Sequence, residues 1–381
     1  MGGLEAGPAA YGTMGSVTEG PKPWVLHVEL DQFIAAVEVL RRPELAGKPV
    51  IVGGRGDPTE RAVVSTASYE ARQFGVGSGM PLRLAARKAP DAIILPVDAD
   101  AYNAASEQVM ATLRGLASEH GPVVVEVLGW DEAFVGVTTD DPEAFAREAM
   151  AAVLDATELY CSVGIGDNKI RAKIATGFGK PRGVFRLTKD NWLEIMGDRP
   201  TIDLWGVGSK ISKRLAALGV ETVRQLAYSD EAALVAEFGP RMGTWYRELG
   251  RGLGSAVVDD SPWIARGHSR ETTYQQNLTS LDEVRDAIRE LAEQVHSDVA
   301  KEGRPVFRVT LKIRYAPFFT QTKARKLKAP THDREDVVAA AVALADTVEP
   351  GREVRLLGVR AEMVMPDEGD PADRTPIRGR L

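Results

Sequence analysis

Three carboxylates stand where apolar, β-rich segments end or turn. Glu29 follows the run that begins at Trp24, and Asp131 and Glu132 lie at a bend between the strand-like segments 122–128 and 133–137. An acidic pair at a hairpin bend is also typical of a solvated turn, so this placement alone leaves both interpretations open. If the three carboxylates converge, they could hold two divalent cations about 4 Å apart, the arrangement for in-line displacement at a phosphate.

A second group of residues could bind a triphosphate. Thr66, Tyr69 and Arg72 follow i, i+3, i+6 spacing, which predicts a hydroxyl, a phenol and a guanidinium on one helical face. An exposed helix with a half-buried tyrosine explains the same spacing. Lys180 follows a segment that carries several cations, and that segment is either a solvated helix face or a positive border of the metal site. Those cations are Lys169, Arg171 and Lys173.

The segment 204–220 predicts a helix-hairpin-helix. Gly206-Val-Gly208 precedes a basic helix, and Leu218-Gly-Val220 follows it. The N–H groups of such a turn bind a DNA phosphate without reading base sequence, and Lys210 and Lys213 add charge there, as does Arg214. Glycines that serve only helix packing are the alternative.

A basic window spans residues 301–328. It contains nine cationic residues and one acid, a net charge of +8 within an acidic chain. Arg308, Lys312 and Arg314 share parity on a strand whose other face is apolar, and Lys323 and Arg325 follow in the next segment. We expect this window to contact the backbone of duplex DNA, although a solvated strand face is the simpler alternative.

The elements that must position these residues form an α+β, multidomain chain. Strands and helices alternate as far as residue 186, short helices follow over 191–254, and 255–266 has the composition of a linker. The last part predicts a β-α-β-β-α-β succession, with strands at 272–278, 306–315, 323–328 and 354–365 and helices at 281–301 and 334–347. The segments 1–23 and 365–381 are expected to be disordered.

Composition excludes several classes of protein. The 381 residues include 47 Lys and Arg against 54 Asp and Glu, so the chain does not coat nucleic acid through bulk charge. A single cysteine, Cys161, excludes a disulfide-stapled domain and a cysteine-based zinc cluster. No apolar stretch is long enough for a membrane span, and the start does not resemble a signal peptide, so a cytoplasmic location is expected.

In order along the chain, these motifs resemble those of the Y-family translesion DNA polymerases of the DNA polymerase IV (DinB) kind, most closely the actinobacterial branch. The resemblance covers about residues 24–364. The stretches that carry it are His27–Glu38, Ala67–Val76, Gly129–Ala133, Cys161–Ile165, Asn168–Ala175, Gly179–Pro181 and Leu204–Gly208.

The resemblance implies a right-hand polymerase. Its parts would be a ferredoxin-like palm (24–40 and 100–186), small fingers (41–99), a helix-hairpin-helix thumb (187–256), a linker (257–265) and a little finger (266–364). It implies error-prone, template-directed nucleotidyl transfer by a monomer that binds primer-template DNA and dNTPs and uses two Mg²⁺ ions. Glu29, Asp131, Glu132 and the Leu30 carbonyl match metal ligands. Residues that match nucleotide contacts are Thr66, Tyr69, Arg72, Lys180, Gln32 and Phe33.

Three departures from the family pattern carry predictions. Glu29 replaces the usual Asp, and its extra methylene should lower activity or favour Mn²⁺ over Mg²⁺. Ile34 replaces the large aromatic residue that excludes a 2′-OH, so rNTPs should be incorporated, and Gln32 could hydrogen-bond that hydroxyl. The tail lacks the short peptide with which many relatives bind the sliding clamp, so clamp recruitment through it is not expected.

Two other functions compete with an active polymerase. A non-catalytic homologue that binds DNA as an accessory in damage tolerance would explain Glu29, while the other intact site residues favour catalysis. A signalling nucleotidyl cyclase can share a palm-like sheet with paired acids, but the Gly206-Val-Gly208 motif and the basic window argue against it.

Overall fold

The computed structural model describes residues 20–366, and the expected disordered lead and tail lie largely outside that range. The chain divides into two compact units: residues up to Glu44 together with Asp98–Asp260, and Leu45–Val97 together with the residues from Ser261 on. Each unit is described by itself. No helix among residues 20–366 has both the length and the hydropathy needed to cross a bilayer.

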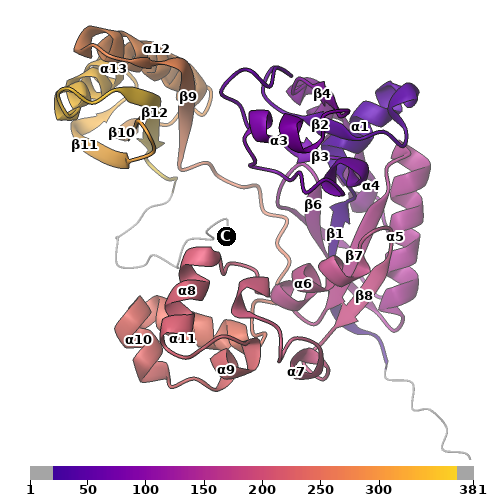
Figure 1. Ribbon diagram of the computed structural model, residues 1–381. Coiled ribbons are helices and arrows are strands. Elements are labelled where there is room, and N and C mark those ends of the chain that lie inside the picture. The colour runs from indigo at the N-terminus through magenta and orange to yellow at the C-terminus, as the bar shows by residue number, and fades with distance from the viewer. Residues whose placement is uncertain (1–19, 367–381) are drawn as a thin grey trace, which may run out of the picture. The chain divides into compact units, whose positions relative to one another are not determined.

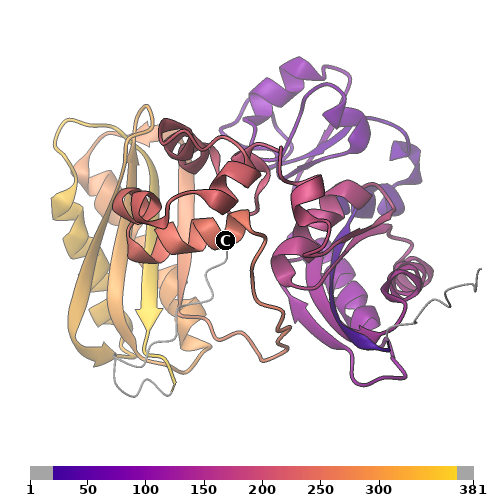
Figure 2. The ribbon, with the colours of Figure 1, turned by 90° about the horizontal axis from the view of Figure 1, so that it is seen from below.

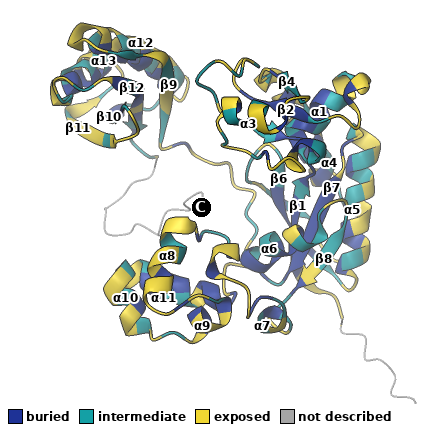
Figure 3. Cartoon of the chain, viewed as in Figure 1, coloured by how far each residue is buried: buried dark blue, intermediate teal, exposed yellow. Residues whose placement is uncertain are grey.

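The first unit is built on a five-stranded sheet with the order β5-β6-β1-β7-β8. The strands are β1 (Lys22–Leu30), β5 (Val124–Val127), β6 (Glu132–Thr139), β7 (Cys161–Gly166) and β8 (Val184–Leu187). The central strands β1 and β7 are largely buried because α4, α5 and α6 pack against the sheet, although β1 also carries His27 and Glu29 (Figures 1 and 3). The helices of this part are α1 (Phe33–Arg41), α4 (Ala99–Arg114), α5 (Pro142–Thr157) and α6 (Lys169–Gly179).

Local sequence explains where these helices start. Asp98 and Asp141 cap α4 and α5 by accepting hydrogen bonds from Ala101 and Ala144, and Pro142 occupies the first turn of α5. Asn168 caps α6 by accepting a hydrogen bond from the N–H of Arg171. The cap therefore fixes where α6 begins, and with it the direction of the lysines that the helix carries.

The rest of the first unit is a set of short helices around a separate apolar core. This core includes Trp192, Leu215, Leu226 and Leu249. The helices are α7 (Trp192–Ile195), α8 (Ser209–Ala217), α9 (Val223–Tyr228), α10 (Glu231–Phe238) and α11 (Pro240–Gly250), with a 3-10 turn, η2, at Thr201–Asp203. The predicted glycine turn is present shortly before α8. In this turn Gly206 adopts φ 92°, a backbone conformation that glycine accepts readily.

The second unit holds two sheets. The smaller has the order β3-β2-β4 and consists of β2 (Val50–Val52), β3 (Thr66–Ala67) and β4 (Ile93–Leu95). The helices α2 (Tyr69–Arg72) and α3 (Leu82–Lys88) belong to the same segment, and a 3-10 turn, η1 (Pro43–Leu45), lies where the chain passes from the first unit into it. Ile51, Ala71 and Leu82 are among the residues that form its core.

The C-terminal part of the second unit follows the predicted β-α-β-β-α-β order. Its four strands form an antiparallel sheet with the order β11-β10-β12-β9. The elements are β9 (Gly267–Leu278), α12 (Leu281–Ala300), β10 (Val306–Tyr315), β11 (Thr320–Thr331), α13 (Arg334–Ala343), a 3-10 turn η3 (Leu344–Thr347) and β12 (Val354–Met363).

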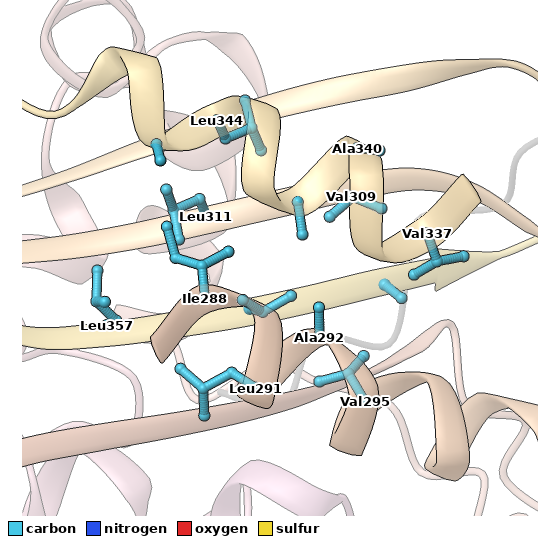
Figure 4. Packing of buried hydrophobic residues seen from close by; sticks show 14 of the residues in the cluster. Ile288, Leu291, Ala292, Val295, Val309, Leu311, Val337, Ala340, Leu344 and Leu357 are labelled. Carbon is cyan, nitrogen blue, oxygen red and sulfur yellow. The ribbon is translucent and has the colours of Figure 1, made fainter. Parts of the chain in front are cut away.

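Both helices pack on one face of this sheet (Figures 2 and 4). Ile288 and Val295 of α12 and Val337 of α13 are buried with Val309 and Leu311 of β10. Because strand residues alternate between the two faces, the other members of β10 point to the uncovered face of the sheet. Those residues include the cations Arg308, Lys312 and Arg314, here called the outer-face trio.

Candidate active site

The register of the five-stranded sheet brings the three predicted carboxylates together. Glu29 at the end of β1 pairs directly with Glu132, the first residue of β6. The backbone N–H of Leu30 donates to the carbonyl oxygen of Asp131 at 2.8 Å, so the bend that carries Asp131 lies against the end of β1. The backbone therefore places the three residues next to one another at one end of the sheet, and their joint role as metal ligands stays a prediction.

Burial and nearby charges shift the pKa values of Asp131 and Glu132 in opposite directions. Burial, and then the negative charges of Glu29 and Glu132, raise the pKa of Asp131 above its usual range. Burial would also raise the pKa of Glu132, but its polar contacts, the ion pair with Lys173 among them, outweigh that effect and hold the pKa at about 2. A cation bound among the three would relieve the repulsion that acts on Asp131.

Two lysines now contact the acids. Lys180, at the C-terminal cap of α6, forms an ion pair with Glu29, and Lys173, in the middle of α6, forms one with Glu132. The run of cations after residue 168 is thus a border of the acidic cluster and not simply a solvated face. Lys169 pairs with Glu126 on β5 and Arg171 with Asp167, so these two cations serve other contacts.

The donor set fits a hard divalent cation. Glu29 and Glu132 each offer a carboxylate oxygen, and these oxygens and a ring nitrogen of His27 all lie within 4.8 Å of one another. Carboxylate oxygens, with the Leu30 carbonyl as a further oxygen donor, are ligands that Mg²⁺ and Mn²⁺ prefer. Glu29 would have to exchange its contact with Lys180 for the ion, whereas Glu132 contacts Lys173 through Oε2 and could offer its other carboxylate oxygen.

Asp31 has a different role from these acids. It is buried, and it accepts hydrogen bonds from the Ser162 hydroxyl at 3.0 Å and from the Arg182 N–H at 2.8 Å. Asp31 therefore ties the loop after α6 to the sheet.

The start of α1 differs in part from the expectation. Gln32 adopts a left-handed conformation with φ 45°, and the side chain of Phe33 is buried, so only the backbone of Phe33 could reach a nucleotide. Ile34 is half-buried. It is thus neither a core residue nor a fully exposed one, which leaves its side chain available to a ligand.

The predicted helical face of Thr66, Tyr69 and Arg72 is wrong in one respect. Thr66 lies on β3, and the helix begins only at Tyr69, because Ser68 caps it by accepting a hydrogen bond from Ala71. Arg72 is exposed, lies over the ring of Tyr69 at 5.0 Å, and donates from Nε to the Ala67 carbonyl at 2.9 Å. Strand and helix ends therefore bring the three residues into one neighbourhood of the second unit.

The basic window is divided between the two faces of its sheet. Lys323 and Arg325 pair with Leu311 and Val309, so they share the parity of the helix-covered face, and we call them the inner-face pair. The expectation of one common surface is corrected here, because a two-residue period separates this pair from the outer-face trio. Lys326, which pairs with Arg308, lies on the outer face.

The outer-face trio is less free than its sequence suggests. Arg308 forms an ion pair with Glu362, Lys312 pairs with Glu271 at 2.6 Å, and Arg314 donates to the Thr320 hydroxyl at 2.8 Å. Glu362 comes from β12, which pairs with β10, and Glu271 comes from β9, which lies on the far side of β12.

In the helical part of the first unit, the cations of α8 also differ among themselves. Lys210 and Lys213 are exposed, and neither forms an ion pair with any residue in the range 20–366. Arg214 instead pairs with Glu237 at 2.6 Å and lies over the ring of Phe238 at 4.3 Å. Only the first two are therefore available at the glycine turn.

Sequence reasoning missed His27 and Thr176. His27 is fully buried on β1, and burial lowers the pKa of its imidazole. Its ring lies between Thr176 of α6 and Glu132 of β6. A histidine in an apolar strand two positions before a candidate ligand is the one signal that could have indicated it.

Comparison with known proteins assigns the chain to a family. The model of the impB/mucB/samB family matches residues 28–177, that of its C-terminal domain matches 265–373, and one described as DNA polymerase-iota, thumb domain, matches 202–253. DNA polymerase IV 2 of Mycobacterium tuberculosis (strain ATCC 25618 / H37Rv) is 51% identical over 350 residues, which are 91% of this chain and 99% of that protein. DNA polymerase IV of Methanoculleus marisnigri is 37% identical over 349 residues, 89% of this chain and 94% of that protein.

Solved structures show the same fold. A Y-family DNA polymerase chimera, Dbh-Dpo4(243-245)-Dbh, has a TM-score of 0.79 at 24% identity and covers 90% of this chain and 100% of its own. DinB from Sulfolobus solfataricus has a TM-score of 0.58 at 25% identity, over 90% of this chain and 99% of its own. The fold is thus that of the Y-family polymerases, with palm, thumb and little finger, and the chain belongs to the DNA polymerase IV (DinB) family of DNA-directed DNA polymerases.

Proposed function

We propose that the chain performs error-prone nucleotidyl transfer on primer-template DNA at the carboxylates of Glu29, Asp131 and Glu132. In this reaction the primer 3′ oxygen bonds to the α-phosphorus of a dNTP, and pyrophosphate leaves as the bond to the bridging oxygen breaks. The observation that carries the proposal is the register that sets Glu29 opposite Glu132, with Asp131 held against Leu30. It supports a site with oxygen donors on two adjacent strands.

Each carboxylate would act mainly as a negatively charged ligand that holds a divalent ion in a fixed position. Divalent ions, two by the family pattern, would activate the 3′ oxygen and offset charge on the phosphates. Glu29, Asp131, Glu132 and the Leu30 carbonyl would fix their positions from rigid strand ends. Lys180, released from Glu29, would pair with the triphosphate. The site would thereby exchange lysine–carboxylate contacts for contacts with ligands.

We further propose that Thr66, Tyr69 and Arg72 of the second unit bind the triphosphate, as the family pattern implies. The exposed guanidinium of Arg72, supported by the Tyr69 ring, is suited to bidentate phosphate binding. Arg72→Lys should raise the KM for dNTP because an ammonium cannot reproduce that geometry. Arg83→Lys, on α3, is the matched control, and an equal effect in both variants would contradict this role for Arg72.

DNA would be bound through two surfaces that read no sequence. One is the turn from Gly206 to Gly208 with Lys210 and Lys213, where backbone N–H groups precede α8. The other is the outer-face trio, whose acidic partners DNA phosphates would have to replace.

The catalytic claim is tested with carboxamide variants. Asp131→Asn and Glu132→Gln should each lower primer extension in Mg²⁺ by at least about 100-fold, because an amide replaces a charged metal ligand. Glu143→Gln is the matched control, since Glu143 lies on α5 and pairs with Arg186 at 3.0 Å. Extension that survives in Asp131→Asn and Glu132→Gln would overturn the site.

The longer side chain of Glu29 favours one competing function, a DNA-binding accessory without catalysis. The specific observation is that Glu29 reaches Lys180 and is neutralised by it. We propose instead a working site with lowered Mg²⁺ activity and a preference for Mn²⁺. Glu29→Asp decides between them: a change from no extension to extension supports the accessory, and a modest gain in Mg²⁺ alone supports the polymerase.

Ile34 should weaken discrimination against ribonucleotides. Its half-buried side chain is smaller than an aromatic ring and would leave room for a 2′-OH. Ile34→Phe should therefore raise the preference for dNTP over rNTP by at least about tenfold, whereas Ile34→Val should not. Equal preference in Ile34→Phe and the parent chain would show that this side chain does not approach the sugar.

A further inference from the structure

His27 is a buried residue with both ring nitrogens engaged next to the candidate active site. Its Nδ1 lies 2.8 Å from the Thr176 hydroxyl oxygen. Its Nε2 lies 3.2 Å from a carboxylate oxygen of Glu132 and 3.2 Å from the ammonium nitrogen of Lys173. Lys173 in turn contacts that same oxygen of Glu132. Three elements, β1, β6 and α6, thus meet at one imidazole.

The surroundings of Thr176 indicate which nitrogen carries the proton. Its hydroxyl oxygen lies 3.1 Å from the carbonyl oxygens of both His27 and Ala172. A hydroxyl that donates its one proton to a carbonyl keeps lone pairs for an incoming donor, so it accepts from Nδ1–H. Nε2 then carries a lone pair and accepts from Lys173. In the opposite tautomer Nε2–H could donate to Glu132 at 3.2 Å, but it would also lie against an ammonium nitrogen 3.2 Å away that already contacts the same carboxylate oxygen.

We propose that His27 is a positioning residue that, as its Nδ1–H tautomer, accepts a hydrogen bond from Lys173 and so holds that ammonium against Glu132. The inference rests on the proposed function, because Glu132 is one of its candidate metal ligands. Lys173 is a flexible side chain with costly rotamer freedom, and three contacts fix it: His27, Glu132 and the face of the Trp205 ring at 5.4 Å. Of these three contacts, His27 is the one that comes from the central strand β1.

Holding Lys173 has a consequence for the reaction. An ammonium fixed beside Glu132 sets the direction of that carboxylate before any ion arrives, and a partner of this kind typically changes metal affinity or activity by about 10- to 100-fold when removed. Loss of His27 should therefore lower kcat and raise the Mg²⁺ concentration needed for half-maximal extension. The KM for dNTP should stay within about twofold, because His27 contacts no candidate triphosphate ligand.

Two substitutions separate positioning from packing. In His27→Gln the side-chain amide oxygen reaches the place of Nε2 and can still accept from Lys173. In His27→Asn the amide reaches only the place of Nδ1, so the bond to Thr176 remains possible and the bond to Lys173 is lost. Both lose the edge contact of the imidazole with Phe134, whose ring centroid lies 5.2 Å away, so both should melt earlier by similar amounts.

The kinetic outcome is then specific. His27→Gln should retain kcat within about threefold of the parent chain, and His27→Asn should lose at least about tenfold. Equal losses in the two variants, at equal melting temperature, would overturn the proposal and leave His27 as a packing residue.

The tautomer can be measured without DNA or nucleotide. The full-length protein, labelled with ¹⁵N-histidine, should give a His27 signal of a neutral ring protonated at Nδ1, assigned by its absence from His27→Gln. Thr176→Val removes the acceptor and should shift the ring toward the Nε2–H form. An Nε2–H ring in the parent chain would refute the proposal whether or not the protein extends primers. Absence of extension together with an Nδ1–H ring would refute the proposed function instead.

Discussion

Gly164 is a point at which α6 closely approaches the sheet. It lies on β7 opposite His27, and a Cβ added there would be 2.0 Å from the Ala172 carbonyl oxygen and 2.3 Å from the Thr176 nitrogen. Ordinary contact begins near 3.4 Å, so Gly164→Ala would force α6 away from β7 by roughly 1.4 Å. The obstacle is helix backbone, which cannot yield by changing a rotamer.

Gly164→Ala should lower both the stability of the fold and the rate of primer extension. Overpacking at a site that cannot relax costs about 3 kcal/mol, and the helix would carry Lys173 and Thr176 away from Glu132 and His27. Gly177→Ala on the same helix is the matched control. A Cβ there meets nothing within 4 Å, so this change should stabilise by about 0.5–1 kcal/mol.

The assay is guanidinium unfolding followed by circular dichroism, with primer extension measured on each variant where it is fully folded. We expect a lower midpoint and lost extension for Gly164→Ala, and an equal or higher midpoint with unchanged extension for Gly177→Ala. A Gly164→Ala protein as stable and as active as the parent would refute the close approach of α6 to β7, and with it the placement of both lysines.

Three further predictions follow from particular contacts. Burial and a 2.7 Å hydrogen bond to Glu38 raise the pKa of Tyr102 to about 12. The neutral phenol therefore stabilises the folded state below pH 10. This contribution, on the order of 2 kcal/mol, is lost as the pH rises from 10 to 12. Tyr102→Phe should flatten this part of the unfolding free energy against pH, and an unchanged slope would contradict the assignment. Replacing all three residues of the outer-face trio with alanine should weaken DNA binding and lower its salt dependence by up to about three released counterions. Replacing the inner-face pair with alanine should change DNA affinity and salt dependence less. Equal effects of the two replacements, measured by fluorescence anisotropy, would contradict the division of faces. Lys210→Ala should lower DNA affinity at unchanged melting temperature. Arg214→Ala should instead lower the melting temperature, because it removes the contacts with Glu237 and Phe238. The reverse pattern would place Arg214 at the DNA.

Much of the fold could be predicted because local signals agree with it. Strand β10 has the predicted bounds because strict alternation marks a half-covered strand, and the predicted order of strands and helices in the last domain is present. The helix at Thr66–Arg72 was predicted too long at its start. Its spacing fits a helix, but pairing of Thr66 with Val52 in a sheet overrides that local preference.

The site was predicted only in part, for a physical reason. Glu29, Asp131 and Glu132 stand at strand ends, which the sequence reveals, but their convergence depends on which strands pair and in what register. The contacts of Lys173, Lys180 and His27 join residues more than 40 positions apart. Likewise, the acids that neutralise Arg308 and Lys312 come from β12 and β9, so the window looked more cationic in sequence than it is in the sheet.

The most direct test of the account is primer extension by the purified full-length chain on an undamaged template. Reactions contain dNTPs or rNTPs, each in Mg²⁺ and in Mn²⁺, with Glu132→Gln as the inactive control. We expect extension with dNTPs that Glu132→Gln abolishes, stronger extension in Mn²⁺, and measurable extension with rNTPs. Binding of primer-template without extension in any of the four reactions would contradict the catalytic claim and support the accessory function.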